Sequence, residues 1–165
     1  MQKILLISDT HSYLDQKLFK YIETVDEVWH AGDIGDITVC KEIEKLKPLK
    51  AVFGNIDGQD ARKLYPENAL FMCEQIKVFI THIGGYPNRY NLEAKKIIEQ
   101  EKPNLFICGH SHILKIMFDK KYNLLHLNPG ACGMHGFHQV KTLLRFAIEG
   151  TEIKNMEIIE LGKRA

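Results

Sequence analysis

Side chains of the types that bind divalent metal ions follow short apolar runs at five places in this chain. Runs such as Ile4 to Ile7 before Asp9, or Val78 to Ile80 before His82, have the length and composition of buried strands. In open parallel α/β sheets, ligands bind at the carboxyl ends of strands, so five such ends can bring distant residues to one place. The seven candidate metal ligands are Asp9, His11, Asp33, Asn55, His82, His110 and His112.

The spacing within two of these groups favours shared ions. Asp9 and His11 are two residues apart, and so are His110 and His112. In an extended loop, side chains at i and i+2 point the same way, so each pair can face the same region. With Asp33 as a shared carboxylate, this set suffices for two metals. Glycine, which permits close packing, directly precedes three candidates, at Gly32, Gly54 and Gly109.

The donor set indicates the kind of metal and the kind of chemistry. Carboxylate, amide oxygen and imidazole without thiolate suit Mn²⁺, Ni²⁺, Co²⁺, Fe or Zn²⁺ better than Ca²⁺ or Mg²⁺. Two cations about 3.5–4 Å apart can activate water and stabilise charge during phosphoester hydrolysis. A single Asp or His after a strand is more often a cap or a turn residue. The metal hypothesis therefore depends on the whole ordered set.

Composition excludes several classes of protein. The chain has 165 residues, 45% hydrophobic and 26% charged, which predicts one domain over residues 1–165. A formal charge of +1 gives no general attraction to nucleic acids or acidic membranes. The first apolar run is too short for a signal peptide or a membrane span, so we expect a cytoplasmic protein. Cys40, Cys73, Cys108 and Cys132 form no Cys-x-x-Cys pair and are expected to be free thiols.

The pattern of elements predicts an α/β fold. Helical spacing of apolar residues occurs over 14–25, 37–46 and 92–98, with strands between these segments. The runs 69–73 and 76–81 predict a hairpin, and 60–65 carries only a weak pattern. From Ile113 onward, apolar runs separated by turn residues predict antiparallel strands. We therefore expect two packed mixed sheets flanked by helices, an αββα sandwich, with the first sheet mostly parallel.

In the order and content of these motifs, the sequence resembles the calcineurin-like metallophosphoesterases. Within them it is similar to the small YfcE-like phosphodiesterases and to the retromer small subunit. The resemblance covers most of the chain. It implies that Asp9, His11 and His112 hold one metal, that Asn55, His82 and His110 hold the other, and that Asp33 bridges them. It further implies two divalent metals, Mn²⁺ foremost, and in-line attack on phosphorus by a hydroxide lying between them.

One position departs from the family pattern. Many relatives carry a histidine after the asparagine as the general acid, whereas this chain has Ile56 there. Isoleucine cannot donate a proton, and general acid catalysis contributes about 10²–10⁴-fold. We therefore expect diesters or activated esters to be preferred over alkyl monoesters. Asp36 and Asp57 are the candidates for holding the ligands in place.

Two functions from different classes follow, a phosphodiesterase acting on a small-molecule phosphoester and a protein-interaction scaffold on the same fold. The intact set of seven ligands favours the enzyme. A nuclease of the same superfamily would need additional DNA-binding elements. Relatives often self-associate, which leaves a homo-oligomer open. Among the remaining histidines we expect core positions for His30 and His126, and exposed positions for His135 and His138 in the loop 133–138.

Overall fold

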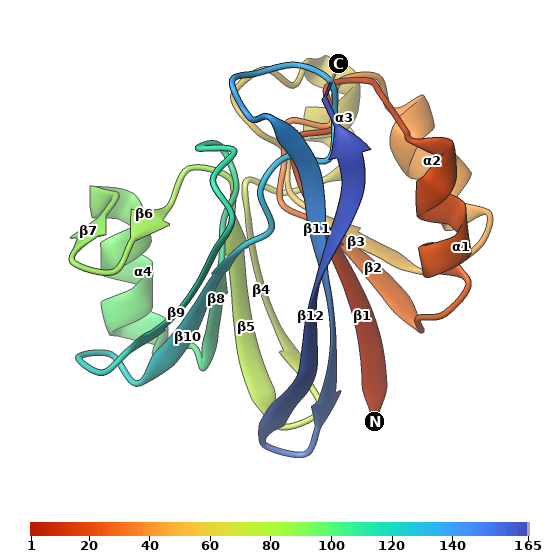
Figure 1. Ribbon diagram of the computed structural model, residues 1–165. Helices are drawn as coiled ribbons and strands as arrows, with labels where there is room; N and C mark the ends of the chain where they lie inside the picture. The colour runs from red at the N-terminus through yellow and green to blue at the C-terminus, as the bar shows by residue number, and fades with distance from the viewer. Residues whose placement is uncertain (165) are drawn as a thin grey trace.

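The computed structural model describes residues 1–164 and contains two five-stranded sheets (Figure 1). The first sheet has the order β12-β11-β1-β2-β3, and the second has the order β4-β5-β8-β10-β9. Strands of the first sheet are β1 (Gln2–Ile7), β2 (Glu27–His30), β3 (Leu49–Ala51), β11 (Val140–Glu149) and β12 (Glu152–Lys163). Strands of the second are β4 (Asn68–Cys73), β5 (Ile76–Thr81), β8 (Leu105–Ile107), β9 (Lys115–Asp119) and β10 (Leu124–Asn128).

Helices cover the outer face of each sheet (Figure 1). The first sheet is covered by the 3-10 helix η1 (Gln16–Leu18), α1 (Phe19–Ile22) and α2 (Thr38–Glu44), whereas α4 (Leu92–Glu101) covers the second. Helix α3 (Gln59–Leu64) and a small hairpin of β6 (Gly85–Tyr86) and β7 (Arg89–Tyr90) lie in the connections. The expected α/β class, two mixed sheets flanked by helices, is confirmed.

Alternation along β1 explains the unbroken apolar run from Ile4 to Ile7. Ile4 and Leu6 pack between the two sheets, and Leu5 and Ile7 pack under the helices. A strand that is buried on both faces has no polar face to present. The core between the sheets is centred on Trp29, whose ring meets Phe71 edge to face at 5.1 Å between centroids.

Two expectations about elements need correction. The first sheet is mixed rather than mostly parallel, because β11 pairs antiparallel with β1, and β12 pairs antiparallel with β11. Pairing of distant segments is not encoded in local periodicity. Helix α3 was missed because only Ala61 of its six residues is buried. The hairpin of β4 and β5 was predicted correctly.

All four cysteines are free, as expected, with Cys40, Cys108 and Cys132 buried and Cys73 half-buried. In residues 1–164, no helix combines the length and the apolar character that crossing a bilayer requires.

Candidate metal centre

The loops after β1, β2, β5 and β8, together with the segment following β3, bring the candidate ligands into one cluster. Backbone hydrogen bonds join the first two loops, from Asp9 N to Gly32 O at 2.9 Å and from His11 N to Asp33 O at 3.0 Å. Strands β1, β2 and β3 are parallel to one another, as are β5 and β8, so the carboxyl ends within each set lie on one side. The convergence that the sequence predicted is therefore present.

The ligand atoms form two groups. Asp9, His11 and His112 offer atoms that lie within 4.8 Å of one another, and Asp33, His82 and His110 do the same. His112 Nε2 lies 3.1 Å from Asp9 Oδ1 in the first group.

Asp33 lies between the two groups, and Asn55 joins the second. Asp33 Oδ2 is 3.4 Å from His11 Nε2 and 3.2 Å from His82 Nε2. His110 Nδ1 donates a hydrogen bond of 3.1 Å to Asn55 Oδ1. All seven predicted residues therefore meet in one place. Whether they ligate metal is part of the proposal below.

Buried atoms without partners show that the residues fit a cation. Asp9 Oδ1, His11 Nε2 and His82 Nε2 are buried and make no hydrogen bond within residues 1–164. Burying polar atoms without partners is unfavourable, and such atoms need an explanation such as an ion. His82 Nδ1 donates to Ala31 O at 2.7 Å, so a neutral ring keeps its Nε2 lone pair free for coordination.

Electrostatics within the cluster favour the negative form of Asp33 and the protonated forms of His11 and His82. The Asp33 carboxylate, whose Oδ2 lies 3.4 Å from His11 Nε2, raises the pKa of His11. Burial lowers the pKa of His82, but the Asp33 carboxylate, 3.2 Å from its Nε2, and the charge of Asp9 raise it overall. Burial raises the pKa of Asp33, yet its two histidine partners bring it well below the usual value. A cation can replace these protons, since it supplies the same positive charge.

Left-handed backbone conformations occur at five of the candidate ligands. Asp9, His11, Asp33, His110 and His112 have φ values of 55°, 45°, 56°, 70° and 62°. Such left-handed conformations are uncommon for residues other than glycine and cost about 1–3 kcal/mol each. They persist only where the surroundings impose them. This clustering is a sign of function that the sequence did not show.

Two glycines allow ligands from different loops to pack closely. A Cβ atom on Gly54 would overlap the backbone N and the carboxylate of Asp33. A Cβ on Gly109 would lie 2.7 Å from Asp9 Oδ2 and overlap the Ser8 hydroxyl. Glycine is required at these positions because a ligand of another loop fills the space.

The two candidate supporting carboxylates lie in different surroundings. Asp57 is buried and accepts three backbone hydrogen bonds, from Gly54 N at 2.7 Å, Gly35 N at 2.8 Å and Ile34 N at 3.1 Å. It therefore fixes the loop of Asp33 against the loop of Asn55. Asp36 is exposed, and its carboxylate accepts from Thr38 N at 2.9 Å at the start of α2. Among the described residues, it makes no side-chain hydrogen bond to a candidate ligand.

Further support comes from residues beside the ligands. Ser8 Oγ donates to Asp9 Oδ2 at 2.5 Å, which leaves Oδ1 for another partner. His30 is fully buried, donates to Thr10 Oγ1 at 3.0 Å and accepts from Gly32 N at 3.1 Å. Burial lowers the pKa of His30 to about 4, so this histidine is neutral, and its expected core position is confirmed.

The loop 133–138 lies beside the first group. His135 is exposed as expected, and its ring centroid is 4.8 Å from that of His11. His138 is not exposed. It is half-buried, it donates from Nε2 to Gly133 O at 2.8 Å, and its ring is 5.2 Å from that of His112. Its exposure was predicted incorrectly because the loop folds back, with Gly133 N donating to Asp9 O at 3.2 Å.

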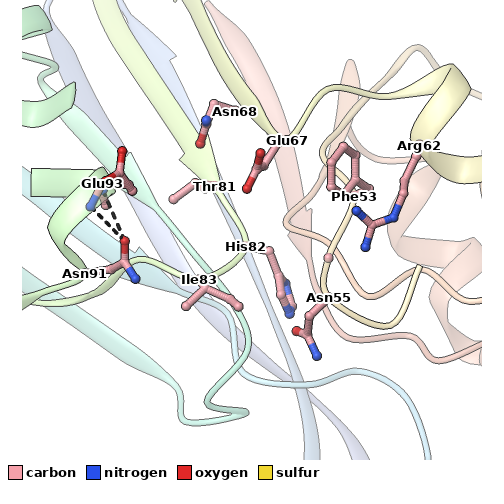
Figure 2. Close-up of a pocket in the computed structure, with 12 residues that line it drawn as sticks. Phe53, Asn55, Arg62, Glu67, Asn68, Thr81, His82, Ile83, Asn91 and Glu93 are labelled. Atoms are coloured by element: carbon pink, nitrogen blue, oxygen red, sulfur yellow. Dashed lines mark hydrogen bonds between the residues drawn. The ribbon is translucent and has the colours of Figure 1, made fainter. Parts of the chain in front are cut away.

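Two pockets flank the second group. The first, of about 360 Å³, contains Asn55 and His82 at one end and polar side chains such as Arg62, Glu67 and Glu93 around it (Figure 2). The second, of about 450 Å³, lies under the β6–β7 hairpin and contains His110. Sequence reasoning missed Arg62, which donates from Nε to Asp57 O at 2.7 Å and stacks on the Phe53 ring at 4.5 Å.

The fold and the two-group site define a class, the calcineurin-like phosphoesterases. The model of the calcineurin-like phosphoesterase superfamily domain matches residues 2–151, and the chain belongs to this family. The resemblance inferred from the motifs is thereby confirmed, and membership supports a phosphoesterase of the hydrolase class.

Individual relatives agree with this family. A probable metallophosphoesterase of Methanothermobacter thermautotrophicus is 28% identical over 131 residues, covering 76% of this chain and 74% of the relative. The structure of an archaeal phosphodiesterase has a TM-score of 0.74 at 25% identity, over 96% of this chain and 99% of that one. Vps29 from Entamoeba histolytica, solved with Zn²⁺, has a TM-score of 0.74 at 17% identity over 99% of both chains. This last likeness shows the fold alone.

Proposed function

We propose that this protein is a phosphodiesterase that uses two divalent metal ions. Asp9, His11 and His112 would hold one ion, Asn55, His82 and His110 the other, and Asp33 would contact both. The observation that carries the proposal is the set of buried donor atoms without partners, Asp9 Oδ1, His11 Nε2 and His82 Nε2, arranged around Asp33.

Hydrogen bonds within the chain hold the proposed metal-binding side chains in position. When bound, a metal pair supplies an activated water and positive charge for the phosphoryl oxygens. Ser8 and the His110 backbone N–H, both bonded to Asp9 Oδ2, orient that carboxylate before any ligand arrives. Asp57 holds the two loops that carry Asp33 and Asn55. Such preorganisation means that little rearrangement is needed during reaction.

Two observations favour diesters over monoesters. A diester has two substituents on phosphorus, and the second ligand group is flanked by two pockets, one reaching Asn55 and His82 and the other reaching His110. Ile56 is half exposed beside the site, and its backbone N–H donates to Asp33 Oδ1 at 3.1 Å. The side chain at this position therefore cannot donate a proton to a leaving group. A leaving group that needs protonation gains no help from this position.

Metal identity, compartment and partners belong to the same proposal. The donor set fits Mn²⁺, Ni²⁺, Co²⁺, Fe or Zn²⁺, and among these the resemblance to the family favours Mn²⁺. Four free cysteines agree with a reducing compartment such as the cytoplasm. The scaffold alternative is supported by fold similarity to Vps29, whereas the complete donor set favours catalysis.

The test combines metal analysis with paired substrates. Purified protein is assayed with bis(4-nitrophenyl) phosphate and with 4-nitrophenyl phosphate, before and after chelation. The same assays are made on Asp33→Ala and Asp33→Asn, with Asp60→Ala as a control carboxylate on exposed α3. Circular dichroism of each variant in chelator shows whether it is folded.

We expect about two metals per chain, faster hydrolysis of the diester, and loss of both metal and activity in folded Asp33 variants. Asp60→Ala should keep both. Diester hydrolysis that survives chelation and the Asp33 substitutions would refute the mechanism. A folded, metal-loaded protein that hydrolyses neither ester would favour the scaffold.

A further inference from the structure

The pocket under the β6–β7 hairpin, here called the hairpin pocket, has features that hydrolysis of a phosphoester bond does not require. It lies between the hairpin and the outer face of the second sheet, and His110 of the proposed metal centre is at its edge. Its volume of about 450 Å³ is within the range of small-molecule sites, roughly 300–1,000 Å³. A ligand in this pocket would lie next to His110 of the proposed metal centre.

A buried histidine with one unpartnered ring nitrogen lines this pocket. His126 is 1% exposed, its ring lies 5.3 Å from that of Phe106, and its Nδ1 makes no hydrogen bond within the described part of the chain. Burial lowers the pKa of His126 to about 4, so the ring is neutral at physiological pH. A neutral imidazole can donate one hydrogen bond and accept another. It therefore suits an uncharged polar ring better than an anion.

The rim of the hairpin pocket is largely apolar and aromatic, with Arg89 and Lys115 as its charged side chains. Ile83, Tyr86 and Ile113 are exposed by 42%, 41% and 63%. Exposed large apolar side chains that gather around a concave site indicate ligand contact. The Tyr86 ring is held by Lys115, whose Nζ lies 4.2 Å from the ring centroid. A flat ring could pack against this rim at little entropic cost, because Tyr86 is already positioned.

The neighbouring pocket has a different character. It contains Arg62, Glu67, Asn68 and Glu93 and is separated from the hairpin pocket by Ile83 and Asn91, which line both. Figure 2 shows these polar side chains on one side of His82 and Asn55. The two pockets thus offer a polar environment for one substituent and an apolar, aromatic environment for the other.

We infer that the hairpin pocket binds an uncharged aromatic ring with hydrogen-bonding groups, of the nucleobase kind, carried by one alcohol of the phosphodiester substrate. Tyr86 and Ile113 would contact the faces of the ring, and His126 would bond to its polar edge. This inference deepens the proposed phosphodiesterase function and rests on it for the identity of the substrate, but binding of the ring itself does not require metal.

The first experiment compares two diesters with the same leaving group. Metal-loaded protein is assayed with thymidine 5′-(4-nitrophenyl) phosphate and with methyl 4-nitrophenyl phosphate. Stacking of a base on an aromatic side chain predicts a kcat/KM at least about 10-fold higher for the nucleoside ester. Tyr86→Ala should reduce this ratio toward one. Phe118→Ala, which removes a 55% exposed aromatic ring of β9 outside the pocket, should leave the ratio unchanged.

The second experiment measures binding without catalysis. Thymidine is titrated into protein kept metal-free with chelator, and backbone amide shifts are followed by NMR. Shifts at Gly85, Tyr86 and Ile113 that Tyr86→Ala weakens several-fold support the inference.

Failures of the two proposals can be told apart. Diester hydrolysis with equal kcat/KM for both esters, or a preference that Tyr86→Ala leaves intact, overturns the aromatic site and leaves the phosphodiesterase standing. Thymidine shifts in the hairpin pocket without hydrolysis of either ester would retain the binding site and overturn the proposed function. An absence of thymidine shifts at these residues overturns the inference.

Discussion

At the scale of single residues, the site depends on positions where one loop has no side chain so that another can approach. Gly54 is the clearest case, since any Cβ there overlaps Asp33. Gly58, four residues later, has no atom within 4 Å of a Cβ, and its φ of −87° is accessible to any residue. The two glycines therefore form a matched pair for testing packing at the metal centre.

Gly54→Ala should weaken metal binding by at least about 10-fold, the loss typical when support of a ligand is disturbed. Gly58→Ala should bind metal as the wild type does. Calorimetric titration of metal-free protein with Mn²⁺ measures both. Equal affinities for the two variants would contradict the packing argument.

Ile56 tests whether the missing proton donor sets substrate preference. Its side chain is 47% exposed, and its backbone N–H bonds to Asp33, so a histidine introduced there would stand at the site. Ile56→His should raise kcat/KM for an alkyl monoester relative to a diester by about 10-fold or more.

The control for this change is Leu64→His, at a 57% exposed position at the end of α3 that lines neither flanking pocket. Leu64→His should not raise kcat/KM for the alkyl monoester relative to the diester. If Ile56→His does not raise this ratio either, the explanation of substrate preference by the missing proton donor is wrong.

At the scale of elements, short loops are held by side chains that cap neighbouring helices. Asn91 Oδ1 accepts hydrogen bonds from Glu93 N at 3.0 Å and Ala94 N at 3.4 Å at the start of α4. The capping residue therefore fixes both the helix and the end of the segment 83–91 that separates the two pockets.

Asn91→Ala should lower the free energy of unfolding by about 1 kcal/mol, because two N–H groups lose their acceptor. Asn91→Asp should restore most of it, since a carboxylate accepts the same bonds and interacts favourably with the helix N-terminus. Urea unfolding in chelator measures the change. A loss that Asp does not rescue would point to pocket packing rather than capping.

At the scale of the whole molecule, burial of neutral histidines couples folding to pH. Burial lowers the pKa of His126 to about 4 in the folded chain, whereas the unfolded histidine titrates near 6.5. Between these values the unfolded chain binds more protons. The contribution to stability is therefore complete above pH 6.5 and is lost as the pH falls toward 4.

His126→Phe should remove this dependence. Between about pH 7 and pH 4.5, the wild type should lose up to about 3 kcal/mol more unfolding free energy than the variant, measured in urea with chelator present. Parallel losses in the two proteins would show that His126 does not titrate on unfolding.

Much of the site could be predicted from sequence because its residues follow strands in a fixed order. Apolar runs located β1, β5 and β8, and the residue after each run is a candidate ligand or leads to one. Helix α3 could not be predicted, because five of its six residues are not buried and so leave no apolar period. The pairing of β11 with β1 depends on contacts more than 130 residues apart, as between Gln2 and Ile148.

The sequence alone determined the types and order of the candidate metal ligands, because donor chemistry and strand patterns are local properties. Only the tertiary structure decided that Asp33 stands between the two groups, that Asp57 rather than Asp36 fastens their loops, and that His138 is half-buried. The same holds for the hairpin pocket, whose residues come from the three separate segments 83–91, 109–115 and 126–128. Such features arise where distant segments pack against one another, and local residue patterns do not encode that packing.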